Sequence, residues 1–195
     1  GWYNDHHFHY GYFAHAAAVI ARLHPKFHLK HKTAFDSIVR DICSVPGGIQ
    51  DVNDDNGSDA PDGSTDANMG NVRRHLVQES FAADRAAPPT NREKKTQFPP
   101  ARHKDMFDGH SWASGLFPQG NGKGQESSSE AANAYYSCFL YGDATKDVAL
   151  QQHSRLLLAM EVQSIRHYWQ MLDTQVYDSY FASSLMVGNV GAFDV

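Results

Sequence analysis

A long polar stretch divides the chain into two regions that can contribute to a core. Between Pro46 and Pro100 the sequence is rich in Gly, Asp, Asn, Ser and Pro, and it has no sustained apolar period. Such a composition buries too little apolar surface to offset the entropy lost when a chain becomes ordered. We therefore predict that residues 46–97 are an insertion or a disordered loop within a helical domain.

Helices are predicted on both sides of this stretch. Apolar spacing and cap residues indicate helices at residues 10–23, 32–43, about 127–142 and about 145–172. The first is Ala-rich, with Phe13, Ala17 and Ile20 at helical spacing, and it ends near Pro25. The tail after residue 175 has more β-branched and aromatic residues and is compatible with an extended piece. The predicted class is mainly α, built of antiparallel helix pairs joined by long loops.

Composition limits the possible partners. The 195 residues carry a formal net charge of −5, with no basic run except Arg92–Lys95, which excludes a nucleic-acid interface. No apolar stretch is long enough to span a bilayer. Cys43 and Cys138 can pair or stay free, and their wide separation excludes a short metal-ligand motif.

The densest group of chemically active side chains lies at the start of the chain. Residues 4–12 read NDHHFHYGY, with one carboxylate, Asp5, and three histidines immediately before a predicted helix. Aromatic walls around a carboxyl group raise its pKa by desolvation, as a general acid near neutral pH requires. Helix capping is the alternative for Asp5 alone, but we interpret the whole cluster as functional.

Two further clusters follow the polar stretch. Glu126 and Glu130 lie four residues apart, which predicts that both carboxylates share one face of the same helix and point toward one site. The alternative is a solvated acidic first turn, which the helix dipole favours. Asp108, His110 and Trp112 lie within five positions. Trp112 either stacks on a sugar ring or packs in the core.

Three segments together resemble the catalytic region of the family 81 endo-β-1,3-glucanases. They are NDHHFHYGY at 4–12, FDGHSWASGL at 107–116 and GQESSSEAANAYY at 124–136. Further agreement lies at residues 39–42, 98–105 and 186–188, so the resemblance covers most of residues 1–45 and 97–190. It implies an (α/α)6 toroid as catalytic domain and an enzyme that cleaves internal β-1,3 bonds with inversion.

The resemblance also implies roles for individual residues. Asp5 is then the general acid, Glu126 the general base, and Glu130 an assisting carboxylate in the same cleft. In inverting glycosidases the acid and base lie roughly 6.5–9.5 Å apart, which leaves room for a water. The other motif positions are expected to line sugar subsites: His6, His9, Tyr10, Asp108, His110 and Trp112.

The same resemblance gives expectations for the partner and the setting. We expect a monomer, outside the cell or in a cell wall, that binds β-1,3-glucan and needs neither a metal nor an organic cofactor. Because the chain begins just before Asp5 and ends soon after Gly188, we expect a fragment in which the ring of helical hairpins is incomplete. We expect little activity from it alone.

Two other functions stay open. One is a metal-binding hydrolase that uses the HHFH segment and nearby acids, but His6, His7 and His9 cannot all face one side of a regular helix or strand. The other is a noncatalytic carbohydrate-binding fragment that keeps the aromatic subsites without the acid and base geometry.

Overall fold

The computed structural model describes residues 5–46, 97–112, 123–171 and 176–192. All of them belong to one unit of the chain, formed by residues 1–48 and 96–195. The predicted insertion, residues 46–97, lies almost entirely outside the described residues, as does the end of the second motif at 113–116.

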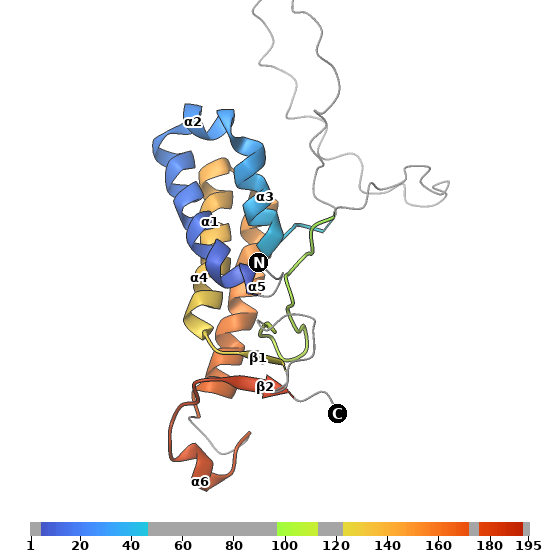
Figure 1. The fold of residues 1–195 in the computed structure, drawn as a ribbon, viewed down its shortest axis with the longest axis vertical. Helices are drawn as coiled ribbons and strands as arrows, with labels where there is room; N and C mark the ends of the chain where they lie inside the picture. The colour runs from blue at the N-terminus through green and yellow to red at the C-terminus, as the bar shows by residue number, and fades with distance from the viewer. Residues whose placement is uncertain (1–4, 47–96, 113–122, 172–175, 193–195) are drawn as a thin grey trace, which may run out of the picture. The chain divides into compact units, whose positions relative to one another are not determined.

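The described part of the chain is mainly helical, as its sequence predicts (Figure 1). In chain order the elements are α1 (His6–Leu23), α2 (Pro25–Lys30), α3 (Lys32–Ile42), β1 (Lys123–Gln125), α4 (Ser128–Thr145), α5 (Val148–Ser164), the π-helical segment η1 (Ile165–Trp169), α6 (Ser179–Ala182) and β2 (Val190–Ala192). No described helix is both long enough and apolar enough to cross a membrane.

Two antiparallel helical hairpins form the body of this unit, which confirms the predicted pairing. The short helix α2 turns the chain so that α3 returns along α1 (Figure 1). Between α4 and α5 the chain turns at Lys146, whose φ is 63°, and Asp147 then caps α5 by accepting a hydrogen bond from the Leu150 amide at 2.9 Å. The tight turn lets α5 pack closely on the end of α4.

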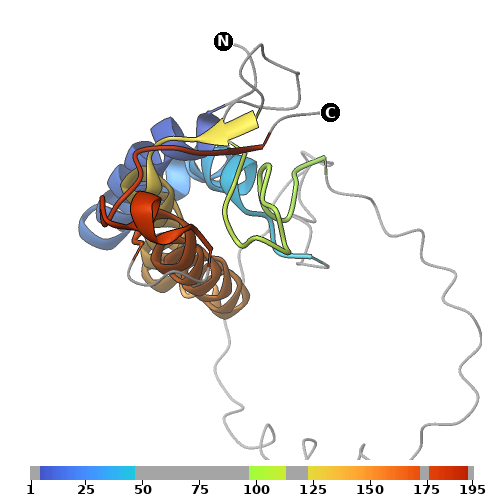
Figure 2. The ribbon, with the colours of Figure 1, turned by 90° about the horizontal axis from the view of Figure 1, so that it is seen from below.

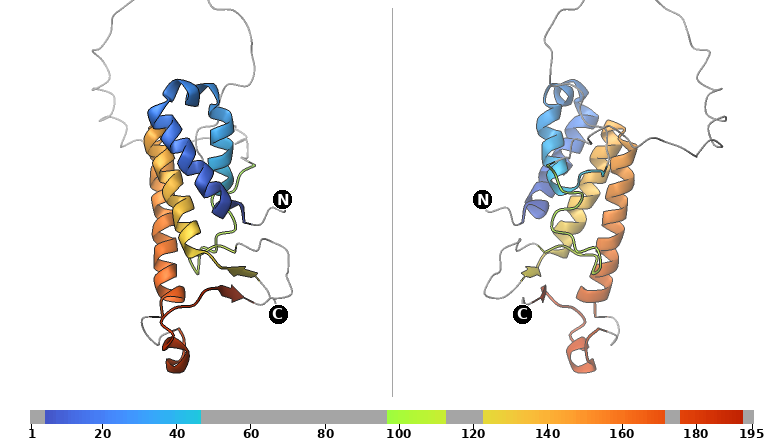
Figure 3. Two further views of the ribbon diagram at one scale, coloured as in Figure 1. Left: turned by 60° about the vertical axis from the view of Figure 1, so that its left-hand side comes forward. Right: turned by 90° about the vertical axis from the view of Figure 1, so that its right-hand side faces the viewer.

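The first helix of each hairpin runs parallel to the other. The Tyr12 hydroxyl donates to Glu130 Oε1 at 3.2 Å near the start of both helices, and Arg22 Nη1 lies 3.5 Å from Asp143 Oδ2 near their ends. Figure 3 shows α1 and α4 side by side in this orientation. The amino ends of α1 and α4 therefore lie at the same end of the pair.

Small residues bring these two helices unusually close. A Cβ added at Gly11 would lie 2.8 Å from the Ala134 Cα, a contact that real side chains do not make. The core between the hairpins is completed by residues from all four long helices: Ala14, Ala17, Ala18, Ala21, Val39, Ile42, Cys43, Tyr135, Cys138, Tyr141, Leu150 and Leu157. Gly11 is thus required for the packing of α1 on α4.

Three details of the predicted helices are wrong. Phe13 is 58% exposed, because the buried residues of α1 that follow it are all alanines. Helix α4 continues past Gly142 to Thr145. A Cβ at Gly142 would lie 3.0 Å from the Gln151 backbone nitrogen, so the glycine allows α5 to pack closely and does not end the helix. Helix α5 ends at Ser164 and not near residue 172, because the chain passes into η1 and then pairs Gln170 with Met186.

A two-stranded antiparallel ribbon pairs β2, near the end of the chain, with β1, which directly precedes α4. Its register pairs Lys123 with Ala192 and Gln125 with Val190, and Figure 2 shows the two strands side by side. The predicted extended piece in the tail is therefore confirmed as β2. Because Gln125 ends β1, the ribbon holds the residues that lead into α4.

Residues 97–112 lie along the end of α3. The Ser44 amide donates to the Pro99 carbonyl at 3.0 Å, and the Arg102 amide donates to the Ile42 carbonyl at 3.0 Å. A bridge between Lys104 and Ser111 then folds this segment back on itself. The chain on the two sides of the long polar stretch is thus joined by backbone hydrogen bonds.

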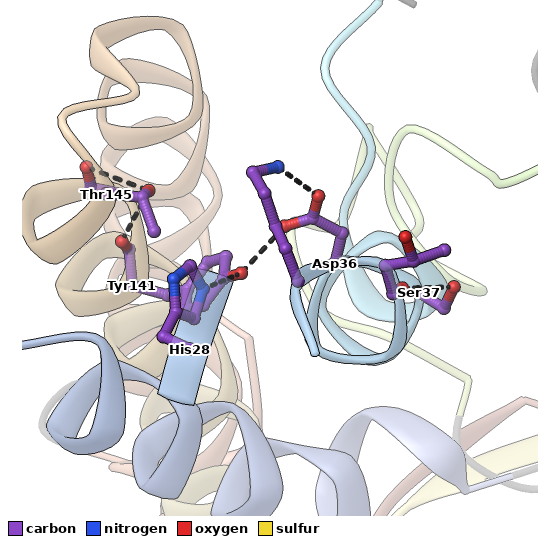
Figure 4. Close-up of polar contacts among 8 residues, drawn as sticks. His28, Asp36, Ser37, Tyr141 and Thr145 are labelled. Carbon is purple, nitrogen blue, oxygen red and sulfur yellow. Dashed lines mark hydrogen bonds and ion pairs between the residues drawn. The ribbon is translucent and has the colours of Figure 1, made fainter. Parts of the chain in front are cut away.

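A buried polar group ties the first hairpin to the far end of α4 (Figure 4). The Tyr141 hydroxyl donates to Asp36 Oδ1 at 2.7 Å and lies 2.8 Å from His28 Nε2, while Lys32 forms an ion pair with Asp36. Burial raises the pKa of Tyr141 and lowers the pKa of His28. This group stabilises the hairpin contact at the end opposite to Asp5.

Candidate active site

The two carboxylates of the acid and base hypothesis occupy equivalent places in the fold. Asp5 directly precedes α1, and Glu126 precedes α4 by two residues. Since α1 and α4 are parallel and packed together, both acids lie at the amino end of the same helix pair. Each acid is placed at this end by the helix that follows it, and not by a long loop.

The Asp5 side chain is available to solvent. It is 42% exposed, and its Oδ2 lies 3.6 Å from Nδ1 of His9, whose side chain is 64% exposed. Asp5 stands at the N-cap position, yet within the described residues its carboxylate caps no backbone amide. The described residues also do not complete the aromatic enclosure that the sequence suggested.

Glu126 and Glu130 differ in setting, and the prediction that both lie on one helix face is wrong. Glu126 is exposed and lies outside α4, because Ser127 is the N-cap and accepts the Glu130 amide at 3.2 Å. Glu130 lies in the first turn and accepts the Tyr12 hydroxyl, and its charge raises the pKa of Tyr12. Glu126 is therefore the freer carboxylate, and Glu130 joins α1 to α4.

The three histidines of the first motif contact three different environments. His6 Nδ1 lies 2.8 Å from Asp41 Oδ2, and Arg102 also binds the Asp41 carboxylate. His7 is fully buried, and burial first, then nearby positive groups, lower its pKa to about 3. Only His9 is largely exposed beside Asp5.

Tyr10 connects this motif to the hydrophobic core. Its ring stacks on His6 at a centroid distance of 4.5 Å and packs against the core cluster. Among the residues that the structure describes, no group of three or more His, Cys, Asp or Glu side chains is arranged to hold a metal ion.

The segment 105–112 is organised around the Asp105 carboxylate. It accepts the amides of Phe107 at 2.8 Å and Asp108 at 3.0 Å, and the Trp112 indole at 3.3 Å. The Asp108 amide is the main reason that the pKa of Asp105 is lowered. Asp108 itself accepts the Tyr168 hydroxyl at 3.0 Å, so its carboxylate is used in holding η1.

His110 and Trp112 have different exposure. His110 is 1% exposed and lies edge-on to Trp112, with ring centroids 4.5 Å apart, and to Trp169, at 5.2 Å. Trp112 is half-buried. Of the two, Trp112 alone presents part of its side chain to solvent within the described residues.

A buried polar network includes the residue that precedes Glu126, and the sequence did not predict it. We call it the Gln125 network; its members are Lys104, Ser111, Gln125, Tyr135 and Glu161. The Gln125 side chain accepts the Ser111 amide at 2.7 Å and donates to Glu161 Oε1 at 2.6 Å, and Lys104 Nζ lies 2.7 Å from Glu161 Oε2. The only sequence signal for it was the position of Gln125 beside Glu126.

Comparison with known proteins identifies related chains. A model of the glycosyl hydrolase family 81 C-terminal domain matches residues 1–56 and 63–190. A glucan endo-1,3-beta-D-glucosidase of Acetivibrio thermocellus is 33% identical over 166 residues, and the primary septum glucan endo-1,3-beta-D-glucosidase of Schizosaccharomyces pombe is 27% identical over 187 residues. These alignments cover 85% and 96% of this chain, but 16% and 14% of the two relatives.

A solved structure agrees with these matches. A mutant of a glycoside hydrolase family 81 protein from Clostridium thermocellum superposes with a TM-score of 0.63 at 27% identity, covering 96% of this chain and 20% of that chain. The chain thus spans about a fifth or less of the length of the proteins it matches.

Proposed function

Because this chain belongs to glycosyl hydrolase family 81, we propose that it supplies the acid and the base of an enzyme that hydrolyses internal β-1,3-glucosidic bonds of β-glucan. The activity is named in its relatives from a bacterium, a yeast and soybean, Glycine max. The observation that supports the proposal in this chain is the common position of Asp5 and Glu126 at the amino end of the parallel pair α1 and α4.

The reaction needs two proton transfers at one glycosidic bond. Protonated Asp5 gives its proton to the glycosidic oxygen as the bond between that oxygen and the anomeric carbon breaks. Glu126 takes a proton from the water that attacks the anomeric carbon from the opposite face, so the new hydroxyl has inverted configuration. The exposed position of Glu126, outside α4, suits a base that must contact water. We expect its carboxyl group to lie roughly 6.5–9.5 Å from that of Asp5 when glucan is bound.

Other residues then bind or support the substrate. His9 and Trp112 present solvent-accessible side chains and suit direct contact with sugar. His6, Tyr10, Asp108 and His110 are better suited to holding the walls of the subsites, because each is engaged by other side chains. Glu130 assists by fixing Tyr12 and the start of α4.

A polymeric substrate also suggests where the protein works. We propose that it acts outside the cell or in a cell wall, where β-glucan is found. The relative from Schizosaccharomyces pombe is named for the primary septum, which agrees with such a setting.

The proposal is tested by replacing each acid with its amide in the complete gene product. Asp5→Asn and Glu126→Gln are expected to lower laminarin hydrolysis by about 10²–10⁴-fold, the usual contribution of general acid or base catalysis. Binding of laminari-oligosaccharides, measured by calorimetry, should change little. Asp143→Asn is a matched control, because its side chain is 41% exposed and lies at the other end of α4.

The outcomes separate the proposal from its alternative. Turnover retained in both amide variants would reject the assigned roles. If the unsubstituted protein binds laminari-oligosaccharides without hydrolysing them, the noncatalytic carbohydrate-binding function is favoured, which the small share of the relatives' length in this chain makes worth testing.

A further inference from the structure

The Gln125 network contains a fully buried ion pair. The side chains of Lys104 and Glu161 are both 0% exposed, with their charged atoms 2.7 Å apart. Removing two charges from water is costly, and a hydrophobic pair of similar volume is often at least as stable. The ion pair therefore calls for an explanation other than stability.

Each side chain of this network makes a polar contact with another member of the network. Glu161 accepts from Lys104 with one oxygen and from Gln125 with the other, and Lys104 Nζ lies 4.6 Å from the centre of the Tyr135 ring. The Tyr135 hydroxyl lies 2.9 Å from Ser111 Oγ, and the Ser111 amide donates to Gln125. Gln125 is thus held from both ends of its amide group and has one possible orientation.

The network ends at the residue before the proposed base. Gln125 is 0% exposed and is paired with Val190 in the ribbon, while Ser127 is fixed as the N-cap of α4. Glu126 is the exposed residue between these two anchored positions. Its Cα is therefore fixed on both sides, although its side chain extends into solvent.

We propose that Gln125, oriented by the Lys104–Glu161 ion pair, is a positioning residue for Glu126. This inference rests on the proposed function, in which Glu126 activates the attacking water. A displacement of about 1 Å in such a group can lower the rate by about 10²-fold, even when the substitution lies outside the reacting centre. In this proposal the role of the ion pair is to hold the Gln125 side chain in one orientation, which fixes the backbone position of Glu126.

A charge exchange between the two side chains provides the test. Gln125→Glu alone sets two carboxylates against each other, and Glu161→Gln alone leaves an amide that cannot accept from both Gln125 and Lys104. In the double variant the carboxylate at 125 accepts from the Ser111 amide and from the new amide at 161, whose oxygen accepts from Lys104. All three hydrogen bonds are thus restored, and the negative charge has moved from position 161 to position 125. We expect each single variant to lower kcat on laminarin by about 10- to 100-fold with little change in KM, and the double variant to recover most of kcat.

A second background separates positioning from a general loss of structure. If Gln125 acts through Glu126, Glu161→Gln should cause no further loss of turnover when Glu126→Gln is already present, because groups that act as a unit are not additive. Tyr141→Phe is the control, since it removes buried hydrogen bonds at the far end of α4. It should lower the melting temperature while leaving kcat unchanged.

The result can overturn this inference without touching the proposed function. Single variants with unchanged kcat, a double variant that fails to recover, or equal losses in the presence and absence of Glu126→Gln would each reject the positioning role. Failure of the proposed function looks different, because Glu126→Gln itself would then retain turnover.

Discussion

Neighbouring residues of one motif have very different chemistry in this protein. His6, His7 and His9 lie within four positions, yet the first contacts Asp41, the second is buried and the third faces solvent beside Asp5. Within the described residues neither ring nitrogen of His7 has a hydrogen-bond partner. Since burial strongly disfavours its charged form, His7 makes folding sensitive to pH.

The effect of His7 has a defined sign. Its pKa falls from 6.5 to about 3 on folding, so between these values the unfolded chain binds a proton that the folded chain does not. The free energy of unfolding therefore falls as pH is lowered through this window, by up to about 1.4 kcal/mol per pH unit. Between pH 7 and pH 5 the loss from this residue should approach about 2 kcal/mol.

Urea unfolding of the His7→Gln variant checks this prediction. The variant should lose less stability than the unsubstituted protein between pH 7 and pH 5. His9→Gln, at an exposed position, is the control and should follow the unsubstituted protein. Equal pH dependence in all three proteins would contradict the assignment.

At the scale of elements, the contact between α1 and α4 determines where the two acids lie. The sequence predicted both helices, because alanine content and cap residues are local signals. It did not predict the close approach at Gly11, because a glycine in a helical pattern carries no information about its partner. The contact is visible only when Ala134 is placed against it.

The packing of α1 on α4 is tested by Gly11→Ala. The new Cβ would lie 2.8 Å from the Ala134 Cα, so the helices must move apart, at a cost of about 1–3 kcal/mol in the free energy of unfolding. Gly188→Ala is the control, because a Cβ there meets nothing within 4 Å of the described structure. It should change stability by less than about 0.5 kcal/mol. Equal stability of the two variants would contradict the close contact.

Helix α5 shows why the candidate site was predicted only in part. A surface helix usually places its apolar residues toward the core and its polar and charged residues toward solvent. In the structure Val148 and Leu156 are exposed, while Ser154, Glu161 and Ser164 are buried. A buried charge cannot be found from periodicity when its partner, Lys104, lies 57 positions away. The motifs thus predicted the candidate acid and base, but not the residues beneath them.

At the scale of the whole molecule, the core joins residues that precede and residues that follow the long polar stretch. Cys43 from the end of α3 and Cys138 from α4 both lie in it, fully buried and free. The contact with Cys43, together with burial, raises the pKa of Cys138. The sequence left open whether these cysteines pair, because their spacing does not report their distance in the fold.

Thiol labelling tests how this core opens. Native protein should react with a small disulfide reagent more slowly than denatured protein by about 10³-fold or more, in line with the usual fraction of unfolded molecules. Both thiols should become reactive together as denaturant is added, since they share one core. A thiol that reacts quickly in native protein, or fewer than two thiols in denatured protein, would contradict the structure.

The hydrogen bonds from Ser44 to Pro99 and from Arg102 to Ile42 have a consequence for how the gene can vary. They join the backbone at residues 42–44 to the backbone at residues 99–102. The packing of the two helical hairpins therefore does not require a particular number of residues between 44 and 99. For a flexible segment between two joined ends, each doubling of its length costs only about 0.6 kcal/mol. Evolution can therefore lengthen or shorten this part of the sequence while both carboxylates keep their places.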